Sequence, residues 1–175
     1  MPLLATSALH SRTGEGYGTP RRCAAGNSRL IMPDGLPHAF VLDIPSDLAY
    51  VRPVRKMIEG LLYAQGWEED DVDDASLILT EIVQNAVEHG SRGDGSERIH
   101  VSVHALDKAV EVEVRDPGTG KDPALAIERD VTAPVPMDEP RGRGLFLIHR
   151  LSAGFEREIA DGGGLCIRAR KEIGA

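Results

Sequence analysis

The 175-residue sequence has few aromatic residues, two cysteines, no long apolar run and no long run of basic residues. Aromatic residues make up 4% of the chain, which argues against the stacking platforms that bind single-stranded nucleic acids. The formal net charge of −8 argues against a nucleic-acid surface or an anionic membrane surface as a partner. A phosphate ligand is still compatible with this charge, because backbone amides and local side chains decide anion binding.

The cysteines and the apolar segments indicate a compartment. Cys23 and Cys166 lie far apart, and no CxxC or Cys/His spacing predicts a zinc site or a disulfide framework. No run approaches the roughly 18 apolar residues that a membrane-spanning helix needs. The N-terminus lacks the basic cluster and apolar core of a secretion signal. We therefore expect two free thiols and a cytoplasmic protein.

Composition divides the chain into a tail, residues 1–36, and one domain, residues 37–175. The tail is rich in Gly, Pro, Ser and Arg and has no apolar periodicity, so we expect it to be disordered or flexible. Over the whole chain, 41% of the residues are hydrophobic and 27% are charged, which is normal for a globular protein. A chain of this length can bury one core.

The first half of the domain predicts a strand and two helices. Alternating residues predict a strand over 39–44, and apolar residues at helical spacing predict a helix from a cap at Ser46 or Asp47 to Gly66. An acidic run, residues 68–74, follows. Acidic residues favour the positive end of the helix dipole, so this run is typical of a solvated helix start rather than of a metal site.

The second helix is expected to begin at Val72 or Ala75 and to end at His89, before Gly90 as the C′ residue. It must bury an apolar stripe, yet it also carries Glu81, Asn85 and His89, spaced four residues apart. Side chains at this spacing lie on one side of a helix, so they form a polar line beside the stripe. Such a line faces solvent in most proteins, and its meaning depends on the rest of the chain.

The second half of the domain predicts an antiparallel sheet. Two alternating segments, 98–106 and 109–116, are joined by a short link and are typical of a hairpin with one apolar and one polar face. Helices should therefore cover only one side of the sheet. The Pro-containing segment 121–140 is expected to be a functional or disordered loop. A third helix should start near Gly144, and a final strand pair should occupy residues 155–172.

Two glycine-rich turns complete the chemistry of a nucleotide site. The turn after the second hairpin strand begins at Asp116, whose carboxylate can accept a hydrogen bond from an exocyclic amine such as that of adenine. Gly118 and Gly120 would let the backbone approach a flat ring. The second turn, residues 142–144, opens a helix whose N–H groups suit phosphates, and Arg143 could add charge there. Each turn alone is explained by a tight turn or a cap, so the order and spacing of the three segments decide the interpretation.

The segments "EIVQNAVEHG", "DPGTG" and "GRGLFLI" resemble the N, G1 and G2 boxes of the GHKL ATPases, which have the Bergerat fold. The short lid between the second and third boxes is most similar to that of the anti-sigma factor serine kinases. The resemblance covers residues 38–172. It implies an α/β two-layer sandwich, in which a mixed, mainly antiparallel sheet is covered by helices on one face.

The resemblance also implies roles for single residues. By position, Glu81 resembles the general base, Asn85 the magnesium ligand and His89 a histidine near the phosphates. Asp116 resembles the aspartate that reads adenine. The other residues that the resemblance assigns to ATP binding are Gly118, Gly120, Gly142, Arg143, Gly144 and Leu145.

Two positions leave questions about this assignment. Arg52 resembles an arginine that contacts the partner antagonist, but Arg55, one turn on, is a rival for this role. Lys121 follows the G1 glycines at a position where an apolar residue is common, so the start of the lid stays open. The lid also has no obvious phosphate contact of its own.

The resemblance implies an ATP-dependent, Mg²⁺-dependent serine/threonine-protein kinase that phosphorylates an anti-sigma factor antagonist protein in a partner-switching circuit. A sigma factor as a second partner and a homodimer are further expectations. One alternative is a non-catalytic ATP- or ADP-binding module, against which Glu81 argues because a binder needs no base. The other alternative is a detached histidine-kinase ATPase domain, against which the lack of an upstream phosphoacceptor helix argues.

Overall fold

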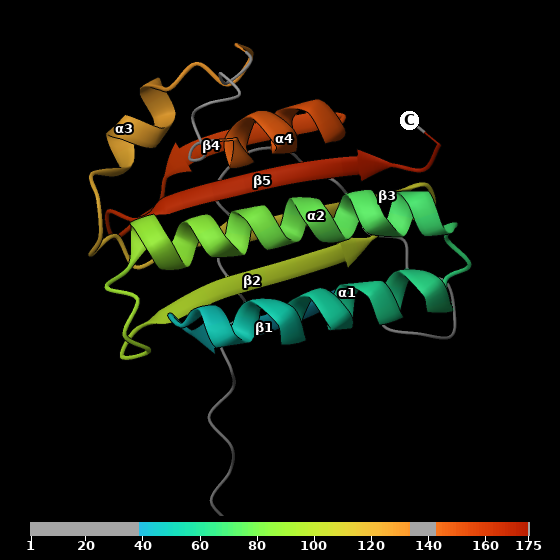
Figure 1. Ribbon diagram of the computed structural model, residues 1–175, viewed down its shortest axis with the longest axis horizontal. Helices are drawn as coiled ribbons and strands as arrows, with labels where there is room; N and C mark the ends of the chain where they lie inside the picture. The colour runs from blue at the N-terminus through green and yellow to red at the C-terminus, as the bar shows by residue number, and fades with distance from the viewer. Residues whose placement is uncertain (1–38, 134–142, 175) are drawn as a thin grey trace, which may run out of the picture.

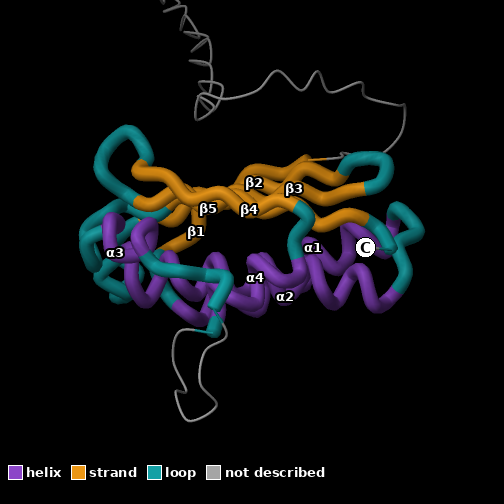
Figure 2. The backbone as a smooth tube through the Cα atoms, turned by 90° about the horizontal axis from the view of Figure 1, so that it is seen from above, coloured by secondary structure: helices purple, strands orange, loops and turns teal. Residues whose placement is uncertain are grey.

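The computed structural model describes residues 39–133 and 143–174, which form a sheet with helices packed on one face (Figures 1 and 2). The predicted tail, residues 1–36, lies outside the described residues, and so does Gly142. In chain order the elements are β1 (Ala39–Pro45), η1 (Leu48–Tyr50), α1 (Val51–Ala64), α2 (Glu69–Asn85), η2 (Ala86–Gly90), β2 (Arg98–Ala105), β3 (Ala109–Arg115), α3 (Pro123–Glu128), α4 (Gly144–Leu151), β4 (Gly154–Ile159) and β5 (Leu165–Glu172).

The five strands form one sheet in the order β1-β2-β3-β5-β4, and every pair of neighbours is antiparallel. The expected hairpin is confirmed, because β2 pairs directly with β3 across the link at residues 106–108. Figure 2 shows α1, α2 and α4 on the same side of the sheet. The predicted two-layer α/β sandwich is therefore confirmed, and within the described residues its sheet is wholly antiparallel rather than mixed.

Alternation along the strands decides which face is buried. Ile99, Val101 and Val103 of β2 are 0% exposed and belong to the core under the helices. On the other face, Arg168 of β5 donates hydrogen bonds to Glu113 at 2.6 Å and to Glu158 at 2.9 Å. The helix-free face is thus covered by charged side chains that pair across the strands, as the polar positions of the sequence predict.

The first helix has the expected apolar stripe and a defined end. Ile58 and Leu62, four residues apart, are both 0% exposed beneath α1. At its C-terminus the Trp67 N–H donates to the Leu62 carbonyl at 3.1 Å, and Gly66 has a φ of +80°. This is a Schellman turn, in which the left-handed residue is glycine, and it ends the helix where the sequence predicts.

At the other end, the expected cap is Asp47 rather than Ser46. The Asp47 side chain accepts a hydrogen bond from the Ala49 N–H at 2.8 Å. The cap opens the single 3-10 turn η1, and α1 continues from that turn. The predicted helix is therefore present, with a tighter first turn.

The second helix begins at Glu69, earlier than the predicted Val72 or Ala75. Three acidic residues occupy its first turn, where the helix dipole favours them. The acidic run is not wholly solvated, however: Asp71 is 9% exposed and lies 3.3 Å from the Nζ atom of Lys171 on β5. Lys171 is itself 3% exposed and also lies 3.2 Å from Asp74. Part of the run therefore attaches α2 to the end of the sheet.

Two further observations on the described residues concern membrane-spanning helices and clusters of metal ligands. Within residues 39–133 and 143–174 no helix is long and apolar enough to cross a membrane. In the same ranges no group of three or more His, Cys, Asp or Glu side chains is arranged to hold a metal ion.

Candidate functional site

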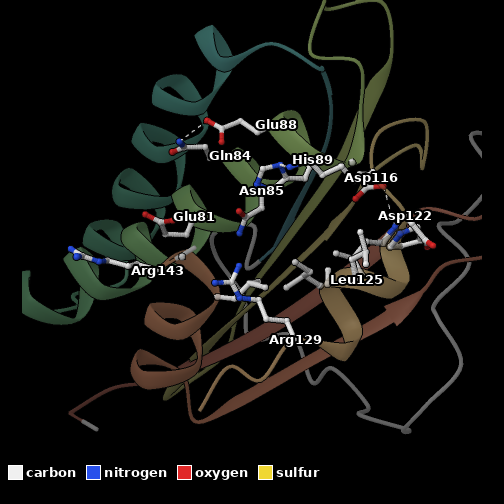
Figure 3. Close-up of a pocket in the computed structure, with 18 of the residues that line it drawn as sticks. Glu81, Gln84, Asn85, Glu88, His89, Asp116, Asp122, Leu125, Arg129 and Arg143 are labelled. Carbon is white, nitrogen blue, oxygen red and sulfur yellow. Dashed lines mark hydrogen bonds between the residues drawn. The ribbon is translucent and has the colours of Figure 1, made fainter. Parts of the chain in front are cut away.

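A cavity of about 950 Å³ lies at the C-terminal end of α2, and we call it the α2 cavity. Its walls come from α2 and η2, from the end of β3, from the segment around α3 and from the start of α4 (Figure 3). These are the segments that contain the three motifs of the sequence. The fold therefore brings the motifs to one place, although they are separated along the chain.

The predicted polar line faces this cavity. Glu81, Asn85 and His89 all line it, so the line is not simply a solvated helix face. The α-helix ends at Asn85, and the chain continues as a π-helical turn from Ala86 to Gly90. Such turns add a residue to the helix and often occur at functional sites. The turn brings both Glu88 and His89 to the cavity wall.

Glu81 lies in a partly buried position against the start of α4. A Cβ atom at Gly144 would lie 2.5 Å from Glu81 Oε2 and 3.4 Å from Asn85 Nδ2. A Cβ atom at position 144 would therefore force the end of the Glu81 side chain to shift, while the Asn85 amide would be in ordinary van der Waals contact. This contact is the direct physical link between the N box and the G2 box.

Burial raises the pKa of the Glu81 carboxyl above its ordinary value, and the negative charge of Glu88 raises it further. No hydrogen bond or ion pair joins the Glu81 side chain to another residue of the described ranges. A carboxylate that is desolvated but unpaired binds a proton more readily than an exposed one. This is the property that a general base near neutral pH needs.

Asn85 adds an amide to the same wall. Its Nδ2 atom is buried and has no hydrogen-bond partner among the described residues. A buried amide without a partner costs free energy, so this orphan group is an expected feature of a site that a ligand completes. The amide offers one oxygen, which suits a metal such as Mg²⁺ that is held by few protein ligands.

Asp116 follows β3 and is held by two backbone amides. Its Oδ1 atom accepts hydrogen bonds from the N–H groups of Gly118 at 2.9 Å and Leu165 at 3.1 Å. Burial raises the pKa of Asp116, while these two hydrogen bonds oppose the increase. The Oδ2 atom has no partner in the described part of the chain, and Asp116 lines the α2 cavity. One carboxylate oxygen is thus fixed and the other is available to a ligand.

Gly90 ends the helix for a different reason than the sequence suggests. Its φ is not in the left-handed region, so it is not the C′ glycine that we predicted. Instead, a Cβ atom at this position would overlap the carboxylate of Asp116. Position 90 must be glycine because a side chain far along the sequence occupies the space.

Gly118 and Gly120 do not line the cavity. A Cβ atom at Gly118 would lie 2.6 Å from the Gly163 carbonyl oxygen, and one at Gly120 would overlap the His89 carbonyl oxygen. The Gly120 N–H also donates to the Gly90 carbonyl at 3.3 Å. The nearest neighbours of both glycines are therefore protein backbone, not the space for a flat ring that we expected. Their close packing fixes the turn that carries Asp116.

The start of α4 has the predicted position. Arg143, Gly144 and Leu145 line the α2 cavity, and Arg143 is the N-cap residue of the helix. In Figure 3 the Arg143 side chain extends away from Asp116 and Asn85, along the side of Glu81. The Arg143 side chain therefore lies at the Glu81 end of the cavity rather than at its centre.

The sequence interpretation missed the cation that the lid supplies. Part of the predicted loop forms the short helix α3, which Asp122 caps by accepting the Ala124 N–H at 3.0 Å. Arg129 follows this helix, lines the α2 cavity, and points toward Asn85 in Figure 3. A six-residue helix is too short to give a clear apolar period, and the signal that could have identified it is the Asp122 cap followed by Pro123 in the first turn.

A side chain of β4 attaches this helix to the sheet. The Arg157 guanidinium donates hydrogen bonds to the carbonyl oxygens of Ala126 and, at 3.1 Å, Arg129. It also lies 5.5 Å from the centre of the Phe155 ring. Burial lowers the pKa of Arg157, although the group stays charged. One cation thereby holds the Ala126 carbonyl of α3 and the carbonyl of Arg129, the residue that follows the helix.

A second hollow, the α1–α2 groove, has a volume of about 620 Å³. It is lined by Leu48, Val51, Arg52, Arg55, Lys56, Thr80 and Gln84. Both rival arginines border it, but Arg55 is engaged with Glu59 at 2.8 Å, whereas no hydrogen bond or ion pair holds Arg52 within the described residues. Gln84 lines the groove and the α2 cavity, so the two hollows are neighbours.

Comparison with protein families gives a match over most of the chain. Residues 44–171 match the histidine kinase-like ATPase domain family. A serine-protein kinase RsbW from Listeria innocua is 28% identical over 118 residues, which cover 64% of this chain and 74% of that protein. A serine-protein kinase RsbW from Halalkalibacterium halodurans is 26% identical over 132 residues, which cover 72% of this chain and 79% of that protein.

Solved structures show the same fold. The SiaB-SiaC complex from Pseudomonas aeruginosa contains a chain with a TM-score of 0.60 and 16% identity, matched over 75% of this chain and 88% of that chain. The RsbU and RsbW domains of Rv1364c from Mycobacterium tuberculosis give a TM-score of 0.56 and 22% identity. That match covers 77% of this chain and 32% of the longer chain. At these identities the likeness concerns the fold, and the predicted fold is confirmed.

Proposed function

Since this chain belongs to the histidine kinase-like ATPase domain family, we propose that it is an ATP-dependent serine/threonine-protein kinase that phosphorylates an antagonist protein. The relatives named serine-protein kinase RsbW support this proposal. The single observation that carries it is the packing of Gly144 against Glu81 and Asn85. The proposed base Glu81, the proposed metal ligand Asn85 and the N-terminus of α4 meet at one wall of the α2 cavity.

In this proposal ATP occupies the α2 cavity. The free Oδ2 atom of Asp116 accepts a hydrogen bond from the adenine amino group, and the phosphates lie toward the N-terminus of α4. The N–H groups at that end carry a partial positive charge and suit an anion. Arg129 and Arg143 line the cavity and add positive charge. Gly142, which the sequence also predicts to contact ATP, lies outside the described residues.

The residues also fit a magnesium ion bound with the nucleotide. Asn85 would hold it through its amide oxygen, and phosphate oxygens and water would complete the coordination. Because the described residues contain no cluster of metal ligands, we expect little metal binding without nucleotide. When bound, Mg²⁺ neutralises charge on the phosphates.

Glu81 would act as the base. Its carboxylate would take the proton from a serine or threonine hydroxyl of the partner while that oxygen bonds to the γ-phosphorus and the bond to the departing ADP breaks. The raised pKa of Glu81 suits this transfer. Positioning and charge neutralisation by the remaining residues would provide most of the rate gain.

The α1–α2 groove is the proposed docking surface for the substrate protein. Arg52 is exposed and free of intramolecular ion pairs in the described ranges, so it is available to an acidic group of the partner. Leu48, at 49% exposed, adds an apolar contact beside it. We propose that the partner is an anti-sigma factor antagonist, with a sigma factor as the alternative occupant. We further propose that the protein works as a cytoplasmic homodimer.

Nucleotide binding can be tested at the contact between Gly144 and Glu81. Gly144→Ala should weaken Mg²⁺–ATP binding by about tenfold, because the new methyl group would displace the Glu81 carboxylate and fill space beside Asn85. Gly60→Ala in α1 is the matched control, since a Cβ there would meet nothing within 4 Å. Equal affinity of both variants by calorimetry would remove the main support for the site.

Activity can be tested with γ-labelled ATP and the cognate antagonist. The wild type should label the antagonist with an acid-stable phosphate, and Glu81→Ala should not. Labelling that survives Glu81→Ala would refute the proposed base. Nucleotide binding without labelling would favour a non-catalytic module, and an acid-labile product would favour the histidine-kinase alternative.

A further inference from the structure

Lys121 makes two contacts with His89. Its backbone N–H donates to the His89 carbonyl at 2.6 Å, and its Nζ atom lies 3.1 Å from Nδ1 of the His89 ring. Both side chains line the α2 cavity. Lys121 stands at a position where an apolar residue is common, and its side chain reaches back to the polar line of α2.

The position of the lysine is fixed by the turn that precedes it. The N–H groups of Thr119 and Gly120 donate to the Gly90 carbonyl at 3.2 and 3.3 Å. Together with the Lys121 N–H, they attach this turn to the π-helical end of α2. The lysine side chain therefore starts from a held backbone, which reduces the entropy lost when its ammonium group reaches the ring.

The chemistry of the pair determines where the ring proton is. An ammonium group carries three N–H donors and no acceptor, so the Nδ1 atom that faces it must be the acceptor. A neutral imidazole with an accepting Nδ1 carries its proton on Nε2. The opposite tautomer would place two donors against each other.

A nearby carboxylate does not impose the opposite tautomer. Glu88 precedes His89, and its Oε1 atom accepts a hydrogen bond from Gln84 Nε2 at 2.9 Å. Within the described residues Lys121 is the one side chain recorded in hydrogen-bond contact with the His89 ring.

We propose that Lys121 is a positioning residue that holds His89 as the Nε2–H tautomer, so that the ring presents a neutral N–H donor to a phosphate oxygen of the bound nucleotide. This inference rests on the proposed nucleotide site for the identity of the acceptor. The tautomer itself does not depend on nucleotide, so the two ideas can fail separately.

The first test is the nitrogen NMR spectrum of the histidine side chains in the nucleotide-free protein. The spectrum is recorded at a pH of about 8.5, which lies above the ordinary pKa of an imidazole and below that of an ammonium group. The His89 signals are assigned by their loss in His89→Gln. We expect Nδ1 unprotonated and Nε2 protonated in the wild type and in Lys121→Arg, which keeps a donor. In Lys121→Met the two tautomers should exchange.

An unchanged tautomer in Lys121→Met, or a wild-type ring protonated on Nδ1, would overturn the proposal. The backbone contact of residue 121 does not involve its side chain, so Lys121→Met should fold, and the amide spectrum of the same sample checks this. Lys108→Met, in the hairpin between β2 and β3, is the matched control for loss of one lysine charge.

The second test is nucleotide affinity. Lys121→Met should weaken ATP binding about three- to tenfold relative to Lys108→Met, the usual effect of a misplaced hydrogen-bond donor. Its affinity for adenosine, which has no phosphate, should be unchanged. Equal losses for ATP and adenosine would overturn the assignment of a phosphate acceptor. If the wild type does not bind ATP, the proposed function and this acceptor fail together, while the tautomer result still decides the role of Lys121.

Discussion

The two ends of α2 treat buried polar groups in opposite ways. At the N-terminal end Lys171 is almost fully buried, but Asp71 and Asp74 lie within 3.3 Å of its ammonium group. At the C-terminal end Glu81 is partly buried without a partner in the described ranges, and Asn85 Nδ2 is an orphan donor. The same helix is therefore attached to the sheet at one end and left incomplete at the other.

This difference separates stability from function. The two partners of a buried ion pair offset each other's desolvation cost. Removing one partner therefore destabilises the fold, even where the intact pair adds little net stability. An unpaired group costs stability and persists where a ligand will use it. The comparison predicts that substitutions at the two ends of α2 have opposite signatures: loss of stability at the Lys171 end, and loss of activity with a gain of stability at the Glu81 end.

The largest expected effect is at Glu81. Glu81→Gln should reduce phosphoryl transfer about 10²–10⁴-fold, the usual contribution of a positioned base. It should also make the nucleotide-free protein more stable. Because the folded pKa of Glu81 is raised, the folded state binds more protons than the unfolded state just above the ordinary carboxyl range, so the free energy of unfolding falls as pH rises through that window. Glu81→Gln removes this slope.

Urea unfolding at several pH values measures that slope, and labelled ATP measures the transfer. A variant that loses both activity and stability would mean that Glu81 serves the fold, and the contrast between the ends of α2 would disappear.

At the other end, Lys171→Met should lower the free energy of unfolding by about 3–5 kcal/mol, because Asp71 would be left buried without its cation. Phosphoryl transfer per folded molecule should be unchanged. The double variant Lys171→Met with Asp71→Asn should recover part of the loss, since the uncompensated charge is then absent. A Lys171→Met protein with the same free energy of unfolding as the wild type would show that the ion pair contributes nothing to stability.

Asp116→Asn should weaken ATP binding by about 1–3 kcal/mol, because the NH2 group of asparagine cannot accept the hydrogen bond that the adenine amino group donates. Calorimetry with ATP gives this number, and Asp107→Asn in the hairpin is the charge-matched control. We expect Asp116→Asn also to stabilise the nucleotide-free protein, because burial raises the pKa of Asp116. Unchanged ATP affinity would count against the adenine contact.

The smallest expected effect is at Glu88. Its charge raises the pKa of Glu81, so Glu88→Gln should move the acidic limb of the pH–rate profile to lower pH. Glutamine keeps an oxygen for the hydrogen bond from Gln84. Glu69→Gln removes the same charge at the far end of α2 and should leave the limb in place. Identical profiles for both variants would exclude an electrostatic role for Glu88.

Local patterns predicted the parts of the fold that depend on neighbours in sequence. Alternation identified the hairpin of β2 and β3, and a helical period with a glycine stop identified α1. The three boxes predicted that Glu81, Asn85 and Asp116 share one site, and all three line the α2 cavity. The information for the hairpin and for α1 lies within single elements, whereas the shared site was predicted from the resemblance of three motifs to one family.

Contacts between distant segments were not predictable in the same way. Gly90 is required by the Asp116 carboxylate, the ring of His89 contacts Lys121, and Asp71 pairs with Lys171. The role of Arg129 depends on α3, which Arg157 of β4 attaches to the sheet. A single sequence carries no local signal for these pairs, because each depends on how the layers pack.

The most direct test of the account is a crystal structure of the protein with Mg²⁺ and a non-hydrolysable ATP analogue. We expect the adenine amino group on Asp116 Oδ2, the metal on the Asn85 amide oxygen, and Glu81 facing the γ-phosphate beside Gly144. An analogue bound outside the α2 cavity, or bound there with Asn85 and Asp116 making no contact to it, would contradict the account.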